Sequence, residues 1–397
     1  MIWGLYKILE LKRIYDMKKN KIIILVLIIL SLTQCTNEPK QIQIEFTNDS
    51  KIDKVNEIVE VEINQISKLE ILFLSHLEII DNITNNEIVY QIVNSNQDEK
   101  VDKIIFQTSI KVGESKTFTF RDGGSEKDFS NLSKTYAKFV PERMDDFAWE
   151  NDRIAFRMYG PALEATGEIS NGIDVWSKNT RNLILDSWYK GEDYHTDHGE
   201  GVDYYKVGPS LGAGGSALWE NKKLNKSKNF TEWKIISNGP IRTNFQLTYA
   251  TRNYQEKSVA EIKNITLDAG KNLNKIEVKY SVDGDSTNYQ NVIGIVKHPG
   301  EDKGATYSKR EKGIFGYWEP TNKLHGNTAV GVIVDPKIID EFMETETHYL
   351  IILKKTSNDS FTYYSGAGWS KSGDFKNFSE WTNYLEKFSQ NLMNPIK

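Results

Sequence analysis

Apolar and polar residues alternate along most of the chain, and this alternation limits the fold more than any other feature. Alternating runs occur at residues 245–249, 276–282 and 330–334, and residues 349–353 form a continuous apolar run. Residues that favour turns separate these runs, and helical periodicity does not intervene between them. A doubly wound parallel fold is therefore disfavoured, and the pattern predicts a mostly β chain with a large antiparallel β-sandwich.

The two ends of the chain carry different patterns. Alternation at residues 42–46 and 59–63 predicts a small N-terminal β domain, and Asn377 with Glu380 predicts the cap of a C-terminal helix. The apolar stripe of that helix is Phe378, Trp381, Leu385 and Phe388. The predicted organisation is a signal peptide at 1–35, a tether at 36–50, a small β domain at 51–130 and a large catalytic sandwich at 131–397.

The first 35 residues resemble an export signal. Met17 is followed by three lysines and by an apolar run over residues 22–30, which is short for a transmembrane span. Cys35, the only cysteine, resembles a bacterial lipoprotein cleavage and lipidation site, although Gln34 departs from the usual small residue. The prediction is an outer-membrane lipoprotein facing the periplasm or the cell surface. An uncleaved membrane anchor is the alternative, and both place the rest of the chain outside the cytoplasm.

Composition narrows the classes of partner. The formal net charge is −5, so the chain lacks the basic character of nucleic-acid-binding proteins. It contains 19 Tyr and 9 Trp, whose flat rings can pack against sugars but also fill β-sandwich cores. The glycines at 208–215 do not form a phosphate-binding loop, because no Lys-Ser/Thr pair closes one.

The stretch from Tyr194 to Gly215 concentrates reactive side chains in a glycine-rich loop. His195, His198 and Tyr205 are candidate acid–base residues, since imidazole and phenol groups transfer protons. His195, His198 and Glu200 are also candidate ligands for a divalent cation, although no cofactor is required by the pattern. The alternative is that both histidines only satisfy backbone groups of the loop.

A charged and aromatic segment precedes this loop. Arg143 is a candidate catalytic residue that could neutralise a substrate carboxylate, or it could pair with an acid of its own segment. The candidate substrate-binding residues are Tyr194, Trp149, Glu150 and Trp369.

Five segments carry a family resemblance. They are residues 139–152, 157–163, 194–201, 238–242 and 366–370. They resemble a family of exported bacterial β-sandwich proteins, first catalogued as a domain of unknown function and found with polysaccharide-utilisation genes. The resemblance implies a fold similar to galactose-mutarotase and polysaccharide-lyase sandwiches. It also implies dehydration of oligosaccharides that a lyase releases, with ulvan as the source polymer, but it assigns no catalytic residue.

Three functions compete on the sequence. The first is an oligosaccharide dehydratase, a carbon–oxygen lyase acting on uronate-containing and sulfated oligosaccharides, with a histidine or tyrosine as base. The second is a glycoside hydrolase with paired carboxylates drawn from Asp145, Asp146, Glu150 and Glu200. The third is a sugar-binding lipoprotein without catalysis, which would present a broad aromatic platform.

Overall fold

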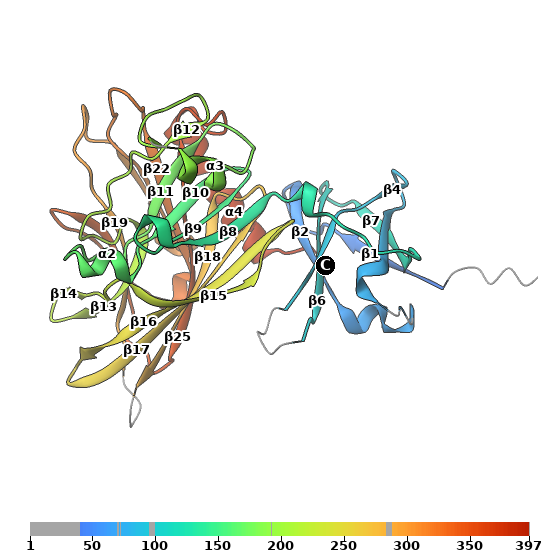
Figure 1. Cartoon of the computed structure of the whole chain (residues 1–397), viewed down its shortest axis with the longest axis horizontal. Coiled ribbons are helices and arrows are strands. Elements are labelled where there is room, and N and C mark those ends of the chain that lie inside the picture. Colours follow the sequence, from blue (N-terminus) through green and yellow to red (C-terminus); the bar gives the residue numbers. More distant parts are fainter. Residues whose placement is uncertain are drawn as a thin grey trace, which may run out of the picture.

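The computed structural model describes residues 40–69, 71, 73–94, 100–191, 193–282 and 288–396. A small N-terminal pair of sheets lies beside a large three-sheet body, and the C-terminus ends between them (Figure 1). The predictions of a mostly β chain, an antiparallel sandwich and a C-terminal helix are confirmed. The predicted signal peptide and Cys35 lie outside the described residues. Within the described part of the chain, no helix is long and apolar enough to cross a membrane.

The N-terminal sheets enclose a core of their own, which contains Phe106, Phe118 and Phe120. Their strands are, in sheet order, β1 (Gln41–Thr47), β7 (Ser115–Asp122), β3 (Leu77–Asp81) and β4 (Asn86–Glu87), and then β2 (Lys54–Glu62), β6 (Lys103–Ile110) and β5 (Tyr90–Val93). The tether predicted at 36–50 is therefore wrong from Gln41 onward. Strand β1 pairs with β7, and its alternating apolar residues pack on this core, as Phe46 does against Phe118.

The large body consists of one eight-stranded sheet and two five-stranded sheets, all antiparallel. The eight strands are β15 (Phe230–Ser237), β16 (Arg242–Tyr254), β17 (Lys257–Asp268), β18 (Leu273–Val282), β25 (Ser360–Trp369), β22 (Thr328–Val334), β21 (Ile314–Trp318) and β20 (Ala305–Lys309). One five-stranded sheet contains β14 (Lys223–Asn225), β13 (Ala213–Glu220), β19 (Asn291–Val296), β24 (His348–Leu353) and β23 (Ile339–Glu344). The other contains β12 (Gly201–Val202), β11 (Asp174–Lys178), β10 (Ala155–Met158), β9 (Asp146–Asn151) and β8 (Thr135–Val140).

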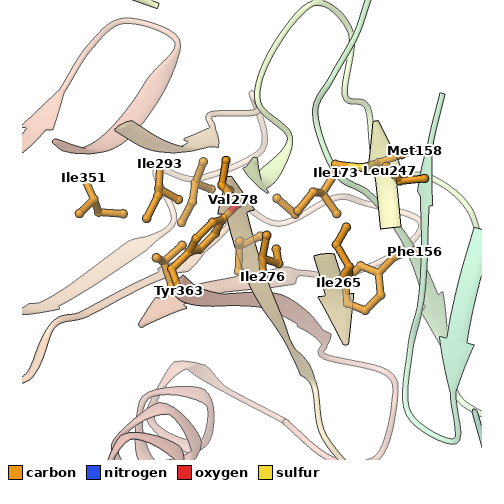
Figure 2. Close-up of a cluster of buried hydrophobic side chains, with 14 of the residues drawn as sticks. Phe156, Met158, Ile173, Leu247, Ile265, Ile276, Val278, Ile293, Ile351 and Tyr363 are labelled. Atoms are coloured by element: carbon orange, nitrogen blue, oxygen red, sulfur yellow. The ribbon is translucent and has the colours of Figure 1, made fainter. Parts of the chain in front are cut away.

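The main core lies between the eight-stranded sheet and both five-stranded sheets. Figure 2 shows Ile265, Ile276 and Val278 of the large sheet between Phe156 of β10 and Ile293 of β19. Close approach of the layers explains part of the glycine-rich segment. Gly214 has φ +88°, and a Cβ atom there would lie 1.8 Å from the Ser365 Oγ atom of β25. Glycine is therefore needed where β13 meets the large sheet.

Helix α4 (Phe378–Met393) covers the opposite face of the eight-stranded sheet. The Asn377 side chain accepts a 3.0 Å hydrogen bond from the Glu380 N–H, so the predicted cap is confirmed. Trp381 and Leu385 are buried, and a Cβ at Gly331 would lie 2.5 Å from Leu385. Two short helices, α2 (Pro161–Ala165) and α3 (Leu185–Lys190), connect strands of the β8–β12 sheet.

Candidate functional site

A buried arginine organises one end of the β8–β12 sheet. Arg157 of β10 lies opposite Asp174 of β11 in the strand register. Its Nε and Nη2 atoms donate to Asp174 Oδ2 at 2.9 and 2.5 Å, and Nη2 also donates to Asp203 Oδ2 at 3.1 Å. Its Nη1 atom lies 3.5 Å from Asp146 Oδ2. One guanidinium thus faces three buried carboxyl groups, which come from β9, β11 and the segment after β12.

The carboxyl groups exceed the single positive charge, so the cluster retains protons. Burial raises the pKa of Asp146 to about 6, although Arg157 opposes that effect. Burial and the neighbouring Asp174 also raise the pKa of Asp203 well above its ordinary value. Phenol groups add further donors, because Tyr159 donates to Asp174 Oδ2 at 3.2 Å and Tyr189 donates to Asp146 Oδ2 at 3.4 Å. The cluster is a proton-holding network in a desolvated setting.

Tyr194 connects this network with the protein surface. Arg157 Nη1 donates to the Tyr194 hydroxyl at 3.4 Å, and the exposed Arg143 guanidinium donates to the same oxygen. Arg143 also lies over the Tyr194 ring, with its Cζ atom 5.1 Å from the centroid. Burial raises the pKa of Tyr194 against the lowering effect of the two arginines. The phenol therefore keeps its proton at neutral pH. Arg143 and Arg157 are placed to stabilise a phenoxide if the proton leaves.

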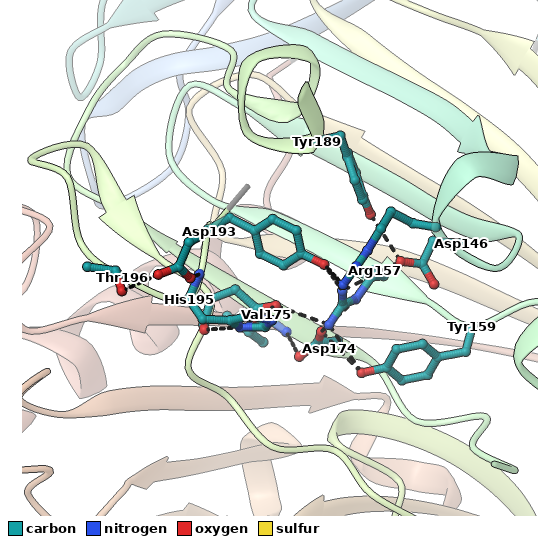
Figure 3. A network of polar contacts seen from close by, with 12 residues as sticks. Asp146, Arg157, Tyr159, Asp174, Val175, Tyr189, Asp193, His195 and Thr196 are labelled. Atoms are coloured by element: carbon teal, nitrogen blue, oxygen red, sulfur yellow. Dashed lines mark hydrogen bonds and ion pairs between the residues drawn. The ribbon is translucent and has the colours of Figure 1, made fainter. Parts of the chain in front are cut away.

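The loop that carries Tyr194 also fixes one imidazole. Figure 3 shows His195 between Asp193 and the Arg157 cluster. Its Nδ1 atom lies 2.9 Å from the Asp203 carbonyl oxygen and 3.5 Å from Asp203 Oδ2. Both atoms are acceptors, so Nδ1 carries the proton. No partner of Nε2 lies among the described residues, and 58% of the side chain is exposed. His195 therefore presents an oriented, basic nitrogen to solvent.

A second acid–imidazole pair joins the partly buried His298 to the buried Glu319. His298 Nδ1 is 2.8 Å from Glu319 Oε1, and His298 Nε2 is 2.6 Å from the Lys206 carbonyl oxygen. Burial lowers the pKa of His298, but the bond and the charge of Glu319 outweigh it, so the pKa is raised. Both ring nitrogens of His298 face acceptor oxygens, so a proton lies on each contact. The His298–Glu319 pair therefore holds two protons, one more than a neutral imidazole beside a carboxylate. Tyr205 packs edge-on against His298, with ring centroids 4.8 Å apart.

The structure brings some of the predicted site residues together. Arg143, Tyr194 and His195 form one contact cluster at the surface. Tyr205 is buried beside His298 instead, and its hydroxyl has no hydrogen-bond partner among the described residues. The catalytic roles of Arg143, His195, His198 and Tyr205 stay predictions.

Three predicted substrate-binding residues are structural, so those predictions are wrong. The Trp149 side chain is fully buried, and its Nε1 atom donates to Asn274 Oδ1 at 2.7 Å. Trp369 is also buried, and its indole donates to the His325 carbonyl oxygen at 2.6 Å. Glu150 is fully buried, and its carboxylate accepts from Lys178 Nζ at 2.6 Å. Each side chain is enclosed, with its polar group already engaged.

The predicted metal ligands lie apart from one another. His198 is exposed, and its Nε2 atom donates to the Asp193 carbonyl oxygen at 3.0 Å. His195 points to Asp203 instead, and Glu200 is exposed. Within the described residues, no three His, Cys, Asp or Glu side chains form a group that could hold a metal ion.

Two cavities differ in their relation to this chemistry. The larger, of about 590 Å³, lies between the N-terminal sheets and the large body. Its charged residues include Arg242, which is already paired with Asp268 and Glu60. The smaller, of about 250 Å³, is lined by Tyr194, Trp188 and the loop that follows them. Because it shares Tyr194 with the surface cluster, the smaller cavity belongs to the candidate site.

Sequence reasoning missed the centre of the site. Arg157 and Tyr159 belong to a motif that carried the family resemblance but received no role, and Asp174 received none either. A signal was present in the strand itself, because β10 is buried at all four positions and yet contains an arginine. A buried arginine requires a buried counter-charge.

Comparison with known proteins identifies the family. Residues 46–397 match the sequence family DUF4861, which is described as a domain of unknown function. The chain belongs to the DUF4861 family. This DUF4861 chain is also similar to the uncharacterized protein P7 of Formosa agariphila, with 35% identity over 342 residues, 80% of this chain and 83% of that protein. The resemblance found in the sequence is therefore confirmed at the level of the family.

Solved structures give a more distant likeness to this DUF4861 chain. A protein in glycosyl hydrolase family 38 from Enterococcus faecalis overlaps 89% of the chain at 11% identity, with a TM-score of 0.46. An alpha-mannosidase from Enterococcus faecalis V583 overlaps 90% at 9% identity, with a TM-score of 0.43. The chain spans less than half of these two proteins, 47% and 45% of their lengths. Similarity this distant assigns no activity.

Proposed function

We propose that the protein is an enzyme that eliminates water from an oligosaccharide, with Arg143, Tyr194 and His195 at the reacting centre. The observation that carries the proposal is the orientation of His195. Its Nδ1–H is held by the Asp203 carbonyl oxygen at 2.9 Å, which leaves the Nε2 lone pair facing solvent, and its ring packs against Tyr194, which Arg143 also contacts. An imidazole whose orientation is fixed by one ring nitrogen can act as a general base through the other.

The neighbours of His195 match the other needs of an elimination. A proton on the carbon next to a carboxylate becomes removable when a cation neutralises that carboxylate. Arg143 is exposed and can bind a carboxylate through two parallel N–H donors. Tyr194 keeps its proton because burial raises its pKa, so the phenol can act as the acid.

The proposed step balances within these three residues. His195 Nε2 takes the carbon-bound proton, and the electron pair of the broken C–H bond forms a C=C bond. The C–O bond on the next carbon breaks, and its oxygen leaves as water after taking the Tyr194 proton. Arg143 and Arg157 stabilise the resulting phenoxide. Transfer of the proton from His195 back to Tyr194 through solvent restores the enzyme.

The substrate class follows from the same groups. Arg143 favours a uronate at the reacting position, which agrees with oligosaccharides released by a polysaccharide lyase. Ulvan as the source polymer, sulfation of the substrate and export as an outer-membrane lipoprotein through Cys35 belong to this proposal. Incorporation of a labelled fatty acid in the native host tests export, because Cys35→Ala must abolish the label.

Hydrolysis of a glycosidic bond is the second candidate. Asp146, with its pKa raised to about 6, could act as an acid, with Asp174 as the second carboxyl group of the pair. Both carboxyl groups are buried, however, and Arg157 occupies the space between them. Paired catalytic carboxylates need room for the glycosidic oxygen and, in inverting enzymes, for a water.

Mass spectrometry of lyase-generated oligosaccharides separates the candidates. We expect the protein to remove one water from a uronate-containing oligosaccharide without shortening it. Shorter oligosaccharides would support hydrolysis, and unchanged masses with measurable binding would support a sugar-binding role. Arg143→Lys keeps the charge but loses the two-point contact, so its product should form more slowly while thermal stability is retained.

A further inference from the structure

The cavity beside Tyr194 has the lining of a sugar subsite. Its volume is about 250 Å³, slightly below the roughly 300 Å³ at which small-molecule sites begin, which suits one ring rather than a chain. The lining consists of Ser187, Trp188, Gly191, Asp193, Tyr194, Thr196, His198, Glu200 and Gly201. It therefore combines two aromatic rings with hydroxyl, imidazole and carboxylate groups.

The aromatic wall is held rigidly by the buried Trp176. The Trp188 ring stacks on Trp176 with centroids 5.6 Å apart, and the Tyr194 ring stacks on Trp176 at 4.8 Å. Trp188 remains partly exposed on the cavity side, whereas Trp176 is fully buried. A fixed aromatic face can pack against the apolar C–H face of a pyranose with little loss of side-chain entropy.

The polar wall is made of acceptors. The Asp193 carboxylate accepts from Thr196 Oγ1 at 2.6 Å and from the His195 N–H at 3.0 Å, and lone pairs remain. The Glu200 carboxylate accepts no hydrogen bond from the described residues, so its oxygens are free to accept from a ligand. His198 donates through Nε2 to the Asp193 carbonyl oxygen, so its Nδ1 atom is also an acceptor. No lysine or arginine is among the described residues that line the cavity.

We infer that this cavity is a subsite for a neutral, hydroxyl-rich sugar ring, and that it excludes rings carrying sulfate or carboxylate. Sugar hydroxyls donate to Asp193, Glu200 and His198, while the ring face lies on Trp188. An anionic group would meet two carboxylates without a cation. The inference rests on the proposed function, because it places the neutral ring next to the uronate that Arg143 binds. The substrate thus has alternating character, neutral in the cavity and anionic at Arg143.

Saturation-transfer NMR with two matched probes tests the inference without turnover. The probes are methyl β-glucopyranoside and methyl β-glucuronide, which differ only in the carboxylate. The neutral probe should bind in a manner that depends on Trp188. Trp188→Ala should weaken it roughly tenfold or more, whereas Trp233→Ala, an exposed tryptophan on β15 with 42% exposure, should leave it unchanged. The glucuronide signal should instead depend on Arg143.

Charge reversal guards against misfolding of the Trp188 variant. Glu200 is exposed, so Glu200→Lys should fold normally, weaken the neutral probe and allow the glucuronide to bind in Arg143→Ala protein. The subsite would be refuted if methyl β-glucopyranoside bound equally well to the wild type, Trp188→Ala and Glu200→Lys proteins. It would also be refuted if this neutral probe did not bind at all. The two proposals fail separately. Loss of water without Trp188-dependent binding refutes the subsite alone, and Trp188-dependent binding without loss of water refutes the elimination alone.

Discussion

His195 and His198 stand three residues apart on one loop but face different groups. His195 is held by Asp203, packs against the Tyr194 ring and presents Nε2 to solvent, whereas His198 is held by the Asp193 carbonyl and faces the cavity. From the sequence, both histidines were candidates for the same roles, acid–base catalysis and metal binding. From the partner of each ring nitrogen we propose that His195 transfers the proton and that His198 binds substrate.

Substitution of these histidines should separate the two roles. His195→Ala should lower turnover by roughly 100-fold or more, with the melting temperature nearly unchanged because the side chain is 58% exposed. His198→Ala should raise KM and leave kcat close to that of the wild type. His76→Ala, in the short 3-10 helix that precedes β3, is the control. Water loss followed by mass spectrometry, together with thermal melts, gives all the values. Wild-type kcat for His195→Ala would place the base elsewhere, first at the His298–Glu319 pair.

Asp146 should make stability depend on pH. Its folded pKa of about 6 exceeds the unfolded value, so the folded state binds the extra proton between those values. The contribution of Asp146 to stability is therefore largest at acid pH and falls as the pH rises through 6. Asp146→Asn removes this loss. The free energy of unfolding of the variant, relative to that of the wild type, should therefore be higher at pH 8 than at pH 4 by about 1–3 kcal/mol. Urea unfolding at both pH values measures the difference, and an equal effect at both would contradict the assignment.

Strands and helices whose pattern is local could be predicted from the sequence. The runs at 245–249 and 330–334 lie in β16 and β22, and the Asn377 cap begins α4. Helix α3, which begins at Leu185, has no such local signal, because the group that caps it comes from elsewhere in the chain. The Glu150 carboxylate, 34 residues away, accepts from the N–H groups of Ile184 and Leu185. The Arg157 cluster was missed for the same reason, since its carboxyl groups come from three separate strands or loops.

Removal of the Glu150 carboxylate should destabilise the β9–α3 region. Glu150→Gln keeps the shape of the side chain but leaves Lys178 buried without its counter-charge. Breaking a buried pair in this way costs about 3–5 kcal/mol. The matched control is Glu164→Gln, which breaks an exposed pair with Lys228 worth about 0–1 kcal/mol. Urea unfolding measures the loss of unfolding free energy in both variants. A smaller loss for Glu150→Gln than for the control would show that the Glu150–Lys178 pair contributes nothing to stability.

The N-terminal sheets and the large body have separate main cores; Ile241 of the body packs into the N-terminal core, and a polar seam also joins the two parts. Gln91 of β5 accepts from the N–H groups of Ile241 and Arg242 at 2.9 and 2.8 Å, and it donates to the Arg242 carbonyl oxygen at 2.9 Å. The buried Lys54 donates to Asn391 Oδ1 at 2.9 Å, near the end of α4. The β2–β6–β5 sheet of the N-terminal part is therefore fixed to the large body and to its helix at two separate points.

This seam should make the two parts unfold together, and Gln91 should control that coupling. Gln91 is buried, so Gln91→Ala leaves two backbone N–H groups and a carbonyl without partners, at about 1–3 kcal/mol for each buried group. Calorimetry should show one transition for the wild type and two for the variant, with the N-terminal sheets melting first. The control is Gln65→Ala, because Gln65 accepts only from the Glu62 N–H within the N-terminal part. A single transition in Gln91→Ala protein would mean that Lys54 and the paired charges around Arg242 suffice to couple the parts. Separate transitions in the wild type would mean that the seam is too weak to hold the N-terminal sheets against the body during unfolding.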